Sequence, residues 1–117
     1  MLPLRRVGAS NSNTVQCILR YCADNYQQDL SLESVAKELH ISKYHISHLF
    51  SQKIHLSFSD FINTLRVQDA CGRLKQGAGI TQACMRAGFS SIRSFNRVFL
   101  RQTGMTPLKY QKKYREL

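Results

Sequence analysis

One apolar pattern occurs twice along this chain, and this repeat limits the possible folds more strongly than composition does. Positions from Leu32 to Ile41 match positions 48 residues further on, and positions from Ile46 to Phe61 match positions 49 residues further on. The matching pairs are Leu32/Ile80, Val35/Ala83, Ala36/Cys84, Leu39/Ala87, Ile41/Phe89, Ile46/Phe95, Leu49/Val98, Phe50/Phe99 and Phe61/Tyr110. In each copy the apolar residues recur at intervals of three and four, as in amphipathic helices. The sequence therefore predicts two copies of one helical unit.

Each copy is predicted to form a short helix, a turn and a second helix, which is the helix-turn-helix pattern. We expect an all-α, homeodomain-like fold of about seven helices, in which a long linker helix joins the two units. Residues 13–117 would form this single domain. The predicted segments are a flexible lead or linker remnant at 1–12, a helix at 13–26, the first unit at about 32–53, the linker helix at about 58–75, the second unit at about 80–102 and a last helix at about 107–114.

The positive charge of the chain is concentrated in its C-terminal part. The net charge is +10, from 17 Lys and Arg against 7 Asp and Glu. Between Ala70 and Arg115 there are ten Lys or Arg and no Asp or Glu, whereas residues 1–69 hold seven basic and six acidic residues. Such a basic region favours a polyanionic partner, with nucleic acid ahead of an anionic membrane.

The stretch from Gly88 to Tyr110 lies in this basic part and predicts a DNA-reading helix. Its apolar residues at i, i+3 and i+4 are Phe95, Val98 and Phe99. The residues at the same spacing on the opposite face are Arg93, Asn96 and Arg97. These three side chains can donate hydrogen bonds to phosphates and to base edges. One face would therefore pack on the core while the other faces a duplex.

The cysteines and the N-terminus indicate a cytoplasmic protein. Cys17, Cys22, Cys71 and Cys84 are widely spaced among apolar residues and form no CxxC pair, so we expect buried free thiols in a reducing compartment. No apolar run approaches the ~20 residues of a membrane span. The first residues contain no apolar segment typical of a signal peptide.

Three segments of the chain together resemble the DNA-binding domain of the AraC/XylS family of bacterial transcription regulators. They are LSLESVAKELHISKYHISHLF, FINTLRVQDACGRL and GFSSIRSFNRVFLRQTGMTPLKY. The resemblance covers about Val15 to Tyr114, and the last segment is the most specific. It implies a sequence-specific, DNA-binding transcription regulator that inserts two recognition helices into adjacent major grooves of promoter DNA. It also implies that the chain is the C-terminal part of a larger regulator, whose sensing or dimerisation domain is absent from this chain.

The resemblance also implies roles for individual residues. The first recognition helix would present Tyr44, Ser47 and His48 to bases, with Lys43 near a phosphate. Ser42, Ser90 and Thr106 would cap helix N-termini, whose free N–H groups can bind phosphate. The second recognition helix would present four residues, of which the arginines suit guanine, the asparagine suits adenine and the isoleucine suits a thymine methyl. These four are Ile92, Arg93, Asn96 and Arg97.

The sequence departs from the family pattern at three places. Ala83-Cys84 stands where Ile-Ala is usual, and His55 stands where a glycine is usual at the end of the first unit. We expect a left-handed backbone at His55. Gln111 replaces a frequent arginine, so one contact to the DNA backbone is expected to be missing.

Several alternatives remain open from the sequence. The basic part could form a non-specific module that binds polyanions or membrane surfaces, or the chain could be a protein-interaction domain that contacts RNA polymerase. Arg66 and Arg73 could contact phosphate or pair within the protein. His45 and His48 lack an obvious third metal ligand, so we expect no metal site and no cofactor. No combination of residues suggests a catalytic centre, and we do not expect an enzyme.

Overall fold

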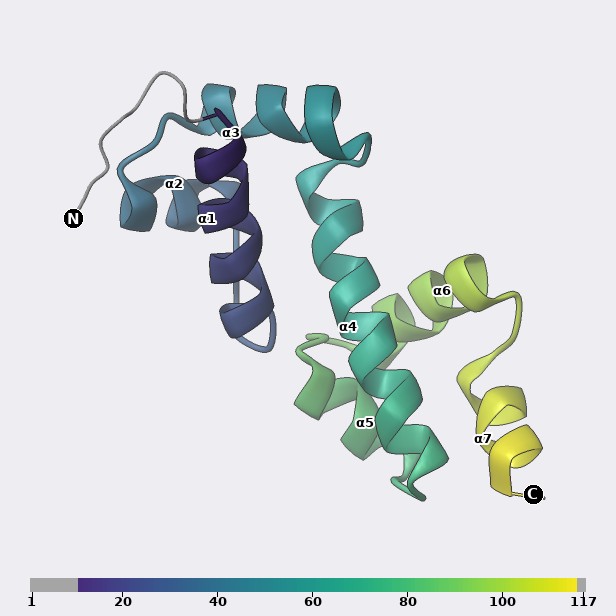
Figure 1. Ribbon diagram of the computed structural model, residues 1–117. Coiled ribbons are helices and arrows are strands. Elements are labelled where there is room, and N and C mark those ends of the chain that lie inside the picture. The colour runs from purple at the N-terminus through teal and green to yellow at the C-terminus, as the bar shows by residue number, and fades with distance from the viewer. Residues whose placement is uncertain (1–10, 116–117) are drawn as a thin grey trace. The chain divides into compact units, whose positions relative to one another are not determined.

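The computed structural model describes residues 11–115, and these residues form an all-α fold, as predicted (Figure 1). The linker helix predicted over about 58–75 has those bounds, whereas the first helix begins at Asn11, two residues earlier than expected. Residues 1–10 of the predicted lead lie outside the described part. The elements are α1 (Asn11–Asn25), α2 (Leu32–Leu39), α3 (Lys43–Leu49), the π-helix η2 (Phe50–Ile54), α4 (Phe58–Lys75), α5 (Ile80–Ala87), α6 (Ile92–Thr103) and α7 (Pro107–Arg115).

The described chain divides into two compact units, and each contains one helix-turn-helix. One unit comprises residues 11–25 and 30–58, and so holds α1, α2, α3 and η2. The other comprises residues 26–29 and 59–115, and so holds most of α4 together with α5, α6 and α7. The short segment Tyr26–Asp29, which links α1 to α2, thus belongs by its contacts to the second unit.

The first unit is built on a small apolar core contributed by α1, α2 and the α3–η2 segment. Its fully or almost fully buried residues are Ile18, Cys22, Val35, Ile46, Leu49 and Phe50. The second helix of this unit changes its hydrogen-bond pattern after Leu49 and ends as a single π-helical turn. The backbone N–H of His55 closes this turn on the carbonyl of Phe50 at 2.7 Å.

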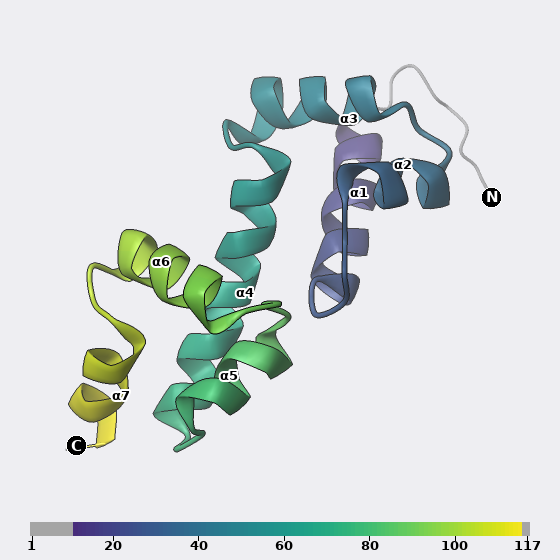
Figure 2. The same cartoon turned by 180° about the vertical axis from the view of Figure 1, so that it is seen from behind.

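The second unit packs α5 and α6 against the C-terminal half of α4. Aromatic rings form the middle of this core, since Phe95 lies 5.0 Å from Phe89 and 5.4 Å from Phe99, measured between ring centroids. Figure 2 shows α5 and α6 meeting at a tight turn beside α4. The buried cluster consists of Val67, Ala70, Leu74, Ala83, Cys84, Ala87, Phe89, Phe95, Val98 and Phe99. The unusual pair Ala83-Cys84 is therefore accommodated within the core.

Two details of the core concern the predictions for the cysteines and for Gln111. Cys17 is exposed, so the expected burial of all four thiols is wrong, although Cys22 and Cys84 are buried. Gln111 is only 6% exposed, and its side-chain amide donates to the carbonyl of Ala78 at 3.0 Å. This position therefore connects α7 to the turn before α5, and the expected absence of a DNA-backbone contact here stays a prediction.

Among the helices described between residues 11 and 115, none has the length and apolar character that a membrane span requires.

Candidate nucleic-acid interface

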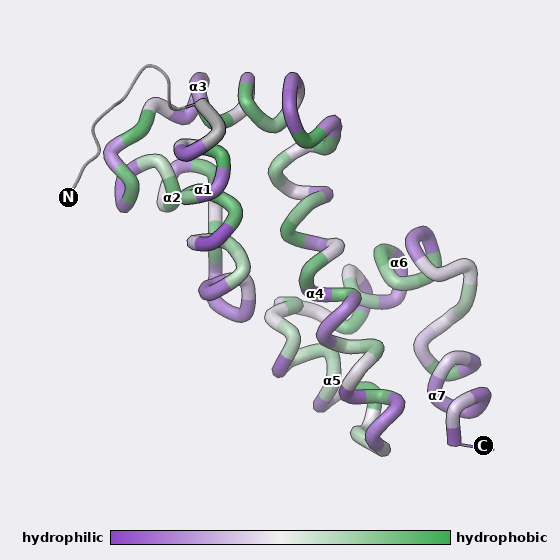
Figure 3. Tube along the Cα trace, in the orientation of Figure 1, coloured by the Kyte–Doolittle hydropathy of each residue, from purple (hydrophilic) through white to green (hydrophobic). Residues whose placement is uncertain are grey.

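Helix α6 has one buried face and one exposed face, and the exposed face carries the predicted DNA-reading residues. Phe95, Val98 and Phe99 are at most 1% exposed. Residues of opposite hydropathy alternate along α6 in Figure 3. The buried rings hold the helix on the core, so the remaining side chains project toward solvent. All four predicted DNA-reading residues of this helix are exposed: Ile92, Arg93, Asn96 and Arg97.

Neither Arg93 nor Arg97 forms a salt bridge with another residue in the described part of the chain. Two other arginines of the second unit are engaged: Arg101 pairs with Asp60 at 3.5 Å, and Arg73 pairs with Asp69. A guanidinium that has no internal partner keeps all of its donors available for a phosphate or for a guanine edge. Arg93 and Arg97 are therefore the α6 residues best prepared to bind an anionic ligand.

The N-cap of helix α6 lies one residue later than predicted. The hydroxyl of Ser91 accepts a hydrogen bond from the backbone N–H of Ser94 at 3.1 Å, so Ser91 is the N-cap. The prediction that Ser90 caps this helix is wrong, because the turn holds one more residue than the turn of the first unit. Ser90 is exposed beside the cap, and its contact with DNA stays a prediction.

Helix α3 presents a less basic face, as the sequence predicted. The ring of Tyr44 is 77% exposed, and Ser47 and His48 are also exposed. Burial of Ile46 and Leu49 determines this orientation. The exposed phenol, hydroxyl and imidazole can each offer single hydrogen bonds, whereas α6 offers two guanidinium groups.

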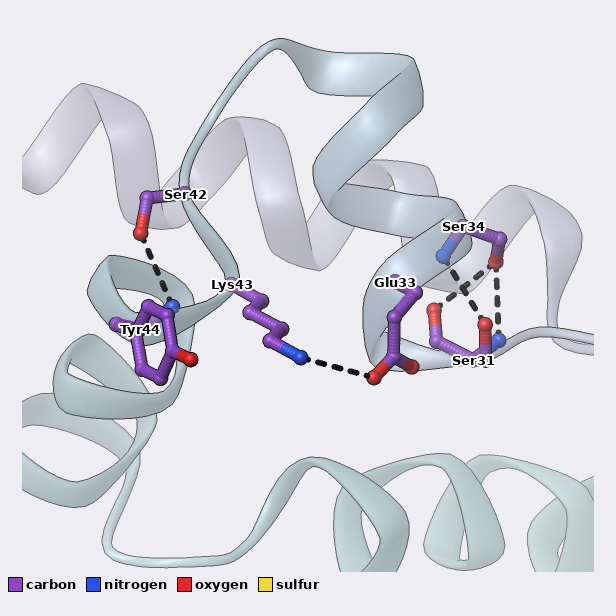
Figure 4. Close-up of polar contacts among 6 residues, drawn as sticks. All are labelled: Ser31, Glu33, Ser34, Ser42, Lys43 and Tyr44. Carbon is purple, nitrogen blue, oxygen red and sulfur yellow. Dashed lines mark hydrogen bonds and ion pairs between the residues drawn. The ribbon is translucent and has the colours of Figure 1, made fainter.

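The residues at the start of α3 are partly occupied by contacts inside the protein (Figure 4). The hydroxyl of Ser42 accepts from the backbone N–H groups of Tyr44 and His45, which confirms Ser42 as the N-cap. The Nζ of Lys43 lies 3.5 Å from a carboxylate oxygen of Glu33 and 5.5 Å from the centroid of the Tyr44 ring. A phosphate near Lys43 would have to compete with Glu33 for this ammonium group.

Three other predictions concern caps, arginines and metals. Thr106 caps α7, because its hydroxyl accepts from the N–H of Lys109 at 3.1 Å. Arg66 donates to the carbonyls of Tyr26 and Gln28, both at 2.8 Å. Of the two roles left open from the sequence, contact with phosphate or bonding within the protein, the structure shows the second. Within residues 11–115 no three His, Cys, Asp or Glu side chains are grouped so that they could hold a metal ion.

Sequence reasoning missed Arg101 and the polar network around Asp69. Arg101 lies four residues after Arg97, one helical turn further on the same side of α6, and its side chain is 59% exposed. Its spacing from Arg97 could have indicated that Arg101 shares this face.

Asp69 is an acidic residue within the apolar pattern of the linker helix, and its side chain is only 8% exposed. An acidic side chain at such a position is a signal for a buried polar partner.

Comparison with known proteins identifies the family to which this helix arrangement belongs. Residues 35–113 match the family model described as a helix-turn-helix domain. The chain belongs to the AraC-type family of helix-turn-helix DNA-binding domains. It is therefore a domain of a transcription regulator and not an enzyme. The AraC-type assignment agrees with the paired units and with the segment from Gly88 to Tyr110.

Individual relatives agree with the AraC-type assignment. The chain is 36% identical over 98 residues to the uncharacterised regulator YpdC of Escherichia coli, with 83% of this chain and 34% of YpdC covered. It therefore spans about a third of YpdC. A solved structure of a probable AraC family regulator from Rhodopseudomonas palustris has a TM-score of 0.77 and 25% identity, with 87% of this chain and 97% of that chain covered. The DNA-binding domain of AdpA, solved with a target DNA, has a TM-score of 0.80 and 20% identity, with 86% of this chain and 92% of that chain covered. This comparison shows a shared fold.

Proposed function

We propose that this AraC-type domain is a sequence-specific promoter-binding module in which α3 and α6 each enter a major groove. The observation that carries the proposal is the exposed face of α6, where Arg93 and Arg97 flank Asn96 and form no ion pair with any residue between 11 and 115. Arginine can bind guanine O6 and N7 bidentately, and asparagine can bind adenine in the same way. The likeness to AdpA, which was solved with its target DNA, supports the same mode of use.

The two recognition helices differ in charge, and we assign them different shares of the binding. Helix α6 supplies most of the electrostatic attachment, because its arginines are exposed and the segment from Ala70 to Arg115 contains no acidic residue. Helix α3 contributes discrimination through Tyr44, Ser47 and His48. In salt-titrated binding, Arg97→Ala is expected to lower affinity and the salt dependence more than His48→Ala does. Equal losses for the two variants would contradict this asymmetry.

The remaining parts of the proposal concern the larger protein, its location in the cell and its protein partners. The chain spans about a third of YpdC, which supports its being one part of a larger regulator. The free cysteines support a cytoplasmic location for this regulator. RNA polymerase is a further candidate partner, since a promoter-bound regulator lies close to it.

Selection of bound sequences from random duplex DNA tests the proposal. We expect an asymmetric site with two recognised segments about ten base pairs apart. A single short segment would mean that only one unit engages. Binding to every duplex without base preference would contradict sequence-specific recognition and favour a general polyanion-binding module. Vesicles of anionic lipid provide the comparison for membrane binding, and we expect no preference for them over the selected duplex.

A further inference from the structure

The segment Tyr26–Asp29, here called the strap, is held by a set of polar contacts to α4. The phenol of Tyr26 donates to a carboxylate oxygen of Asp69 at 2.5 Å, and the side-chain amide of Gln27 donates to the same oxygen at 2.9 Å. The other oxygen of Asp69 accepts from Arg73 at 2.5 Å. A nearly buried carboxylate with three donors is a strong attachment point, because each hydrogen bond to the charged group is charge-assisted.

Arg66 fastens the backbone of the same strap. Its guanidinium donates to the carbonyl oxygens of Tyr26 and Gln28, each at 2.8 Å. Two residues three positions apart on α4, Arg66 and Asp69, thus hold both the side chains and the main chain of the strap. Both lie on α4 within the second unit.

The strap also touches the turn that positions the second recognition helix. A Cβ placed on Gly88 would lie 2.7 Å from the carbonyl oxygen of Tyr26 and 2.9 Å from the Cα of Gln27. The absence of a side chain at Gly88 therefore allows the strap to pack directly on the turn between α5 and α6. Figures 1 and 2 both show the loop after α1 beside this turn.

Chain connectivity gives these contacts their consequence. The residues before the strap form α1 and those after it form α2, and both helices belong to the first unit. The chain therefore passes between the two units at both ends of the strap and again at Phe58–Ser59. The linker helix is accordingly not the only covalent connection between the two units.

We infer that the strap couples the two DNA-binding units, and that Asp69 is the positioning residue that holds the strap. The inference rests on the proposed function, because coupling matters when both units bind one duplex. Two tethered modules bind one target more tightly than either does alone, provided that the tether keeps the second module at a high effective concentration. Releasing the strap removes part of this advantage without touching either recognition helix.

Asp69→Asn is the principal test variant, and Asp60→Asn is its matched control. Both substitutions remove one negative charge from α4, and both free an arginine, Arg73 in one case and Arg101 in the other. The added positive charge alone would raise DNA affinity. A loss of affinity in Asp69→Asn is therefore not an effect of net charge. Tyr26→Phe, which removes only the phenol oxygen, is the milder second variant should Asp69→Asn unfold.

The measurement compares two duplexes: the two-segment site selected by the unmodified chain, and the same site with the segment bound by α3 scrambled. We expect Asp69→Asn to lose at least about fivefold in affinity for the two-segment site. On the scrambled site it should show only the small gain from added positive charge that Asp60→Asn also shows. Asp60→Asn should change both affinities alike. Loss on both sites, or on neither, would overturn the coupling.

Amide hydrogen exchange without DNA separates this result from failure of the proposed function. Exchange at Gln27, Gln28 and Asp29 should be faster in Asp69→Asn than in Asp60→Asn. Equal exchange would overturn the role of Asp69, whatever the chain binds. If the unmodified chain selects no duplex, the proposed function fails and the coupling of DNA-binding units fails with it, while faster exchange would still identify Asp69 as the residue that holds the strap.

Discussion

The backbone of His55 adopts the same left-handed conformation as that of Gly104, its counterpart 49 residues further along the chain. The φ and ψ angles are 64° and 28° at His55, and 78° and 3° at Gly104. The other helix ends of the two units show the same correspondence, since His40 has a φ of 57° and Gly88 a φ of 109°. Each helix-turn-helix thus ends its helices in one way, with glycine in the second copy and histidine in the first.

Replacing His55 by glycine should stabilise the domain. A left-handed backbone costs a residue with a Cβ about 1–2 kcal/mol, and glycine at position 55 would remove this cost. The greater freedom of glycine in the unfolded chain offsets part of the gain in stability. We expect His55→Gly to raise the free energy of unfolding by about 0.5–1 kcal/mol, measured by urea denaturation. Gly104→Ala is the reciprocal control. It should lower that free energy by about 1 kcal/mol, since a Cβ there meets no atom within 4 Å and only the backbone is strained. A destabilised His55→Gly would contradict the account.

Gly88→Ala should be more damaging than Gly104→Ala. Both positions have a positive φ, but only at Gly88 would the new Cβ clash with backbone atoms, those of Tyr26 and Gln27. Adding an overpacking penalty to the backbone strain gives an expected loss of about 2–4 kcal/mol. The same denaturation series measures both variants. Equal losses would show that the strap yields easily at this point.

The pKa of the Asp69 carboxyl gives a prediction for acid unfolding. Burial acts to raise this pKa, but hydrogen bonds from Tyr26, Arg73 and Gln27 outweigh burial and hold it below its ordinary value. The folded state therefore binds the proton less readily than the unfolded state does. The contribution of Asp69 to stability is complete above the ordinary carboxyl pKa of about 3.9, and it is lost as the pH falls through the lower folded-state pKa.

Thermal unfolding of the unmodified chain and of Asp69→Asn, followed from pH 7 downwards, checks this prediction. The difference in Tm between the two should be constant at neutral pH and should shrink on the acid side of about pH 4. A difference that instead shrinks above pH 5 would mean that the carboxyl is not the group responsible.

The sequence predicted those features that depend on local apolar spacing. The bounds of α4 and the first residues of α2 and α5 followed from the periodicity of their buried residues. The left-handed conformation at His55 followed from its place at a helix end. The cap of α6 was placed one residue early, because two adjacent serines offer the same chemistry and only the backbone path distinguishes Ser90 from Ser91.

Long-range polar contacts could not be predicted in the same way. The long-range partners of Asp69 are Tyr26 and Gln27, which lie 43 and 42 residues away, and no periodicity connects them. Gln111 was interpreted from the surface chemistry of the arginine usual at that position, but its amide is buried against Ala78. In both cases the tertiary packing decides whether a polar side chain faces DNA or the protein.

The central claim is that the exposed face of α6 recognises bases, and one comparison tests it most directly. Arg97→Ala and Arg115→Ala each remove one exposed arginine from the second unit, the first from α6 and the second from α7. Affinity for the selected duplex and for its single-base variants is measured for both. We expect Arg97→Ala to cost about 1–3 kcal/mol and to abolish the preference at one base pair, while Arg115→Ala leaves every base preference intact. Equal losses with all base preferences retained in both variants would contradict base recognition by α6.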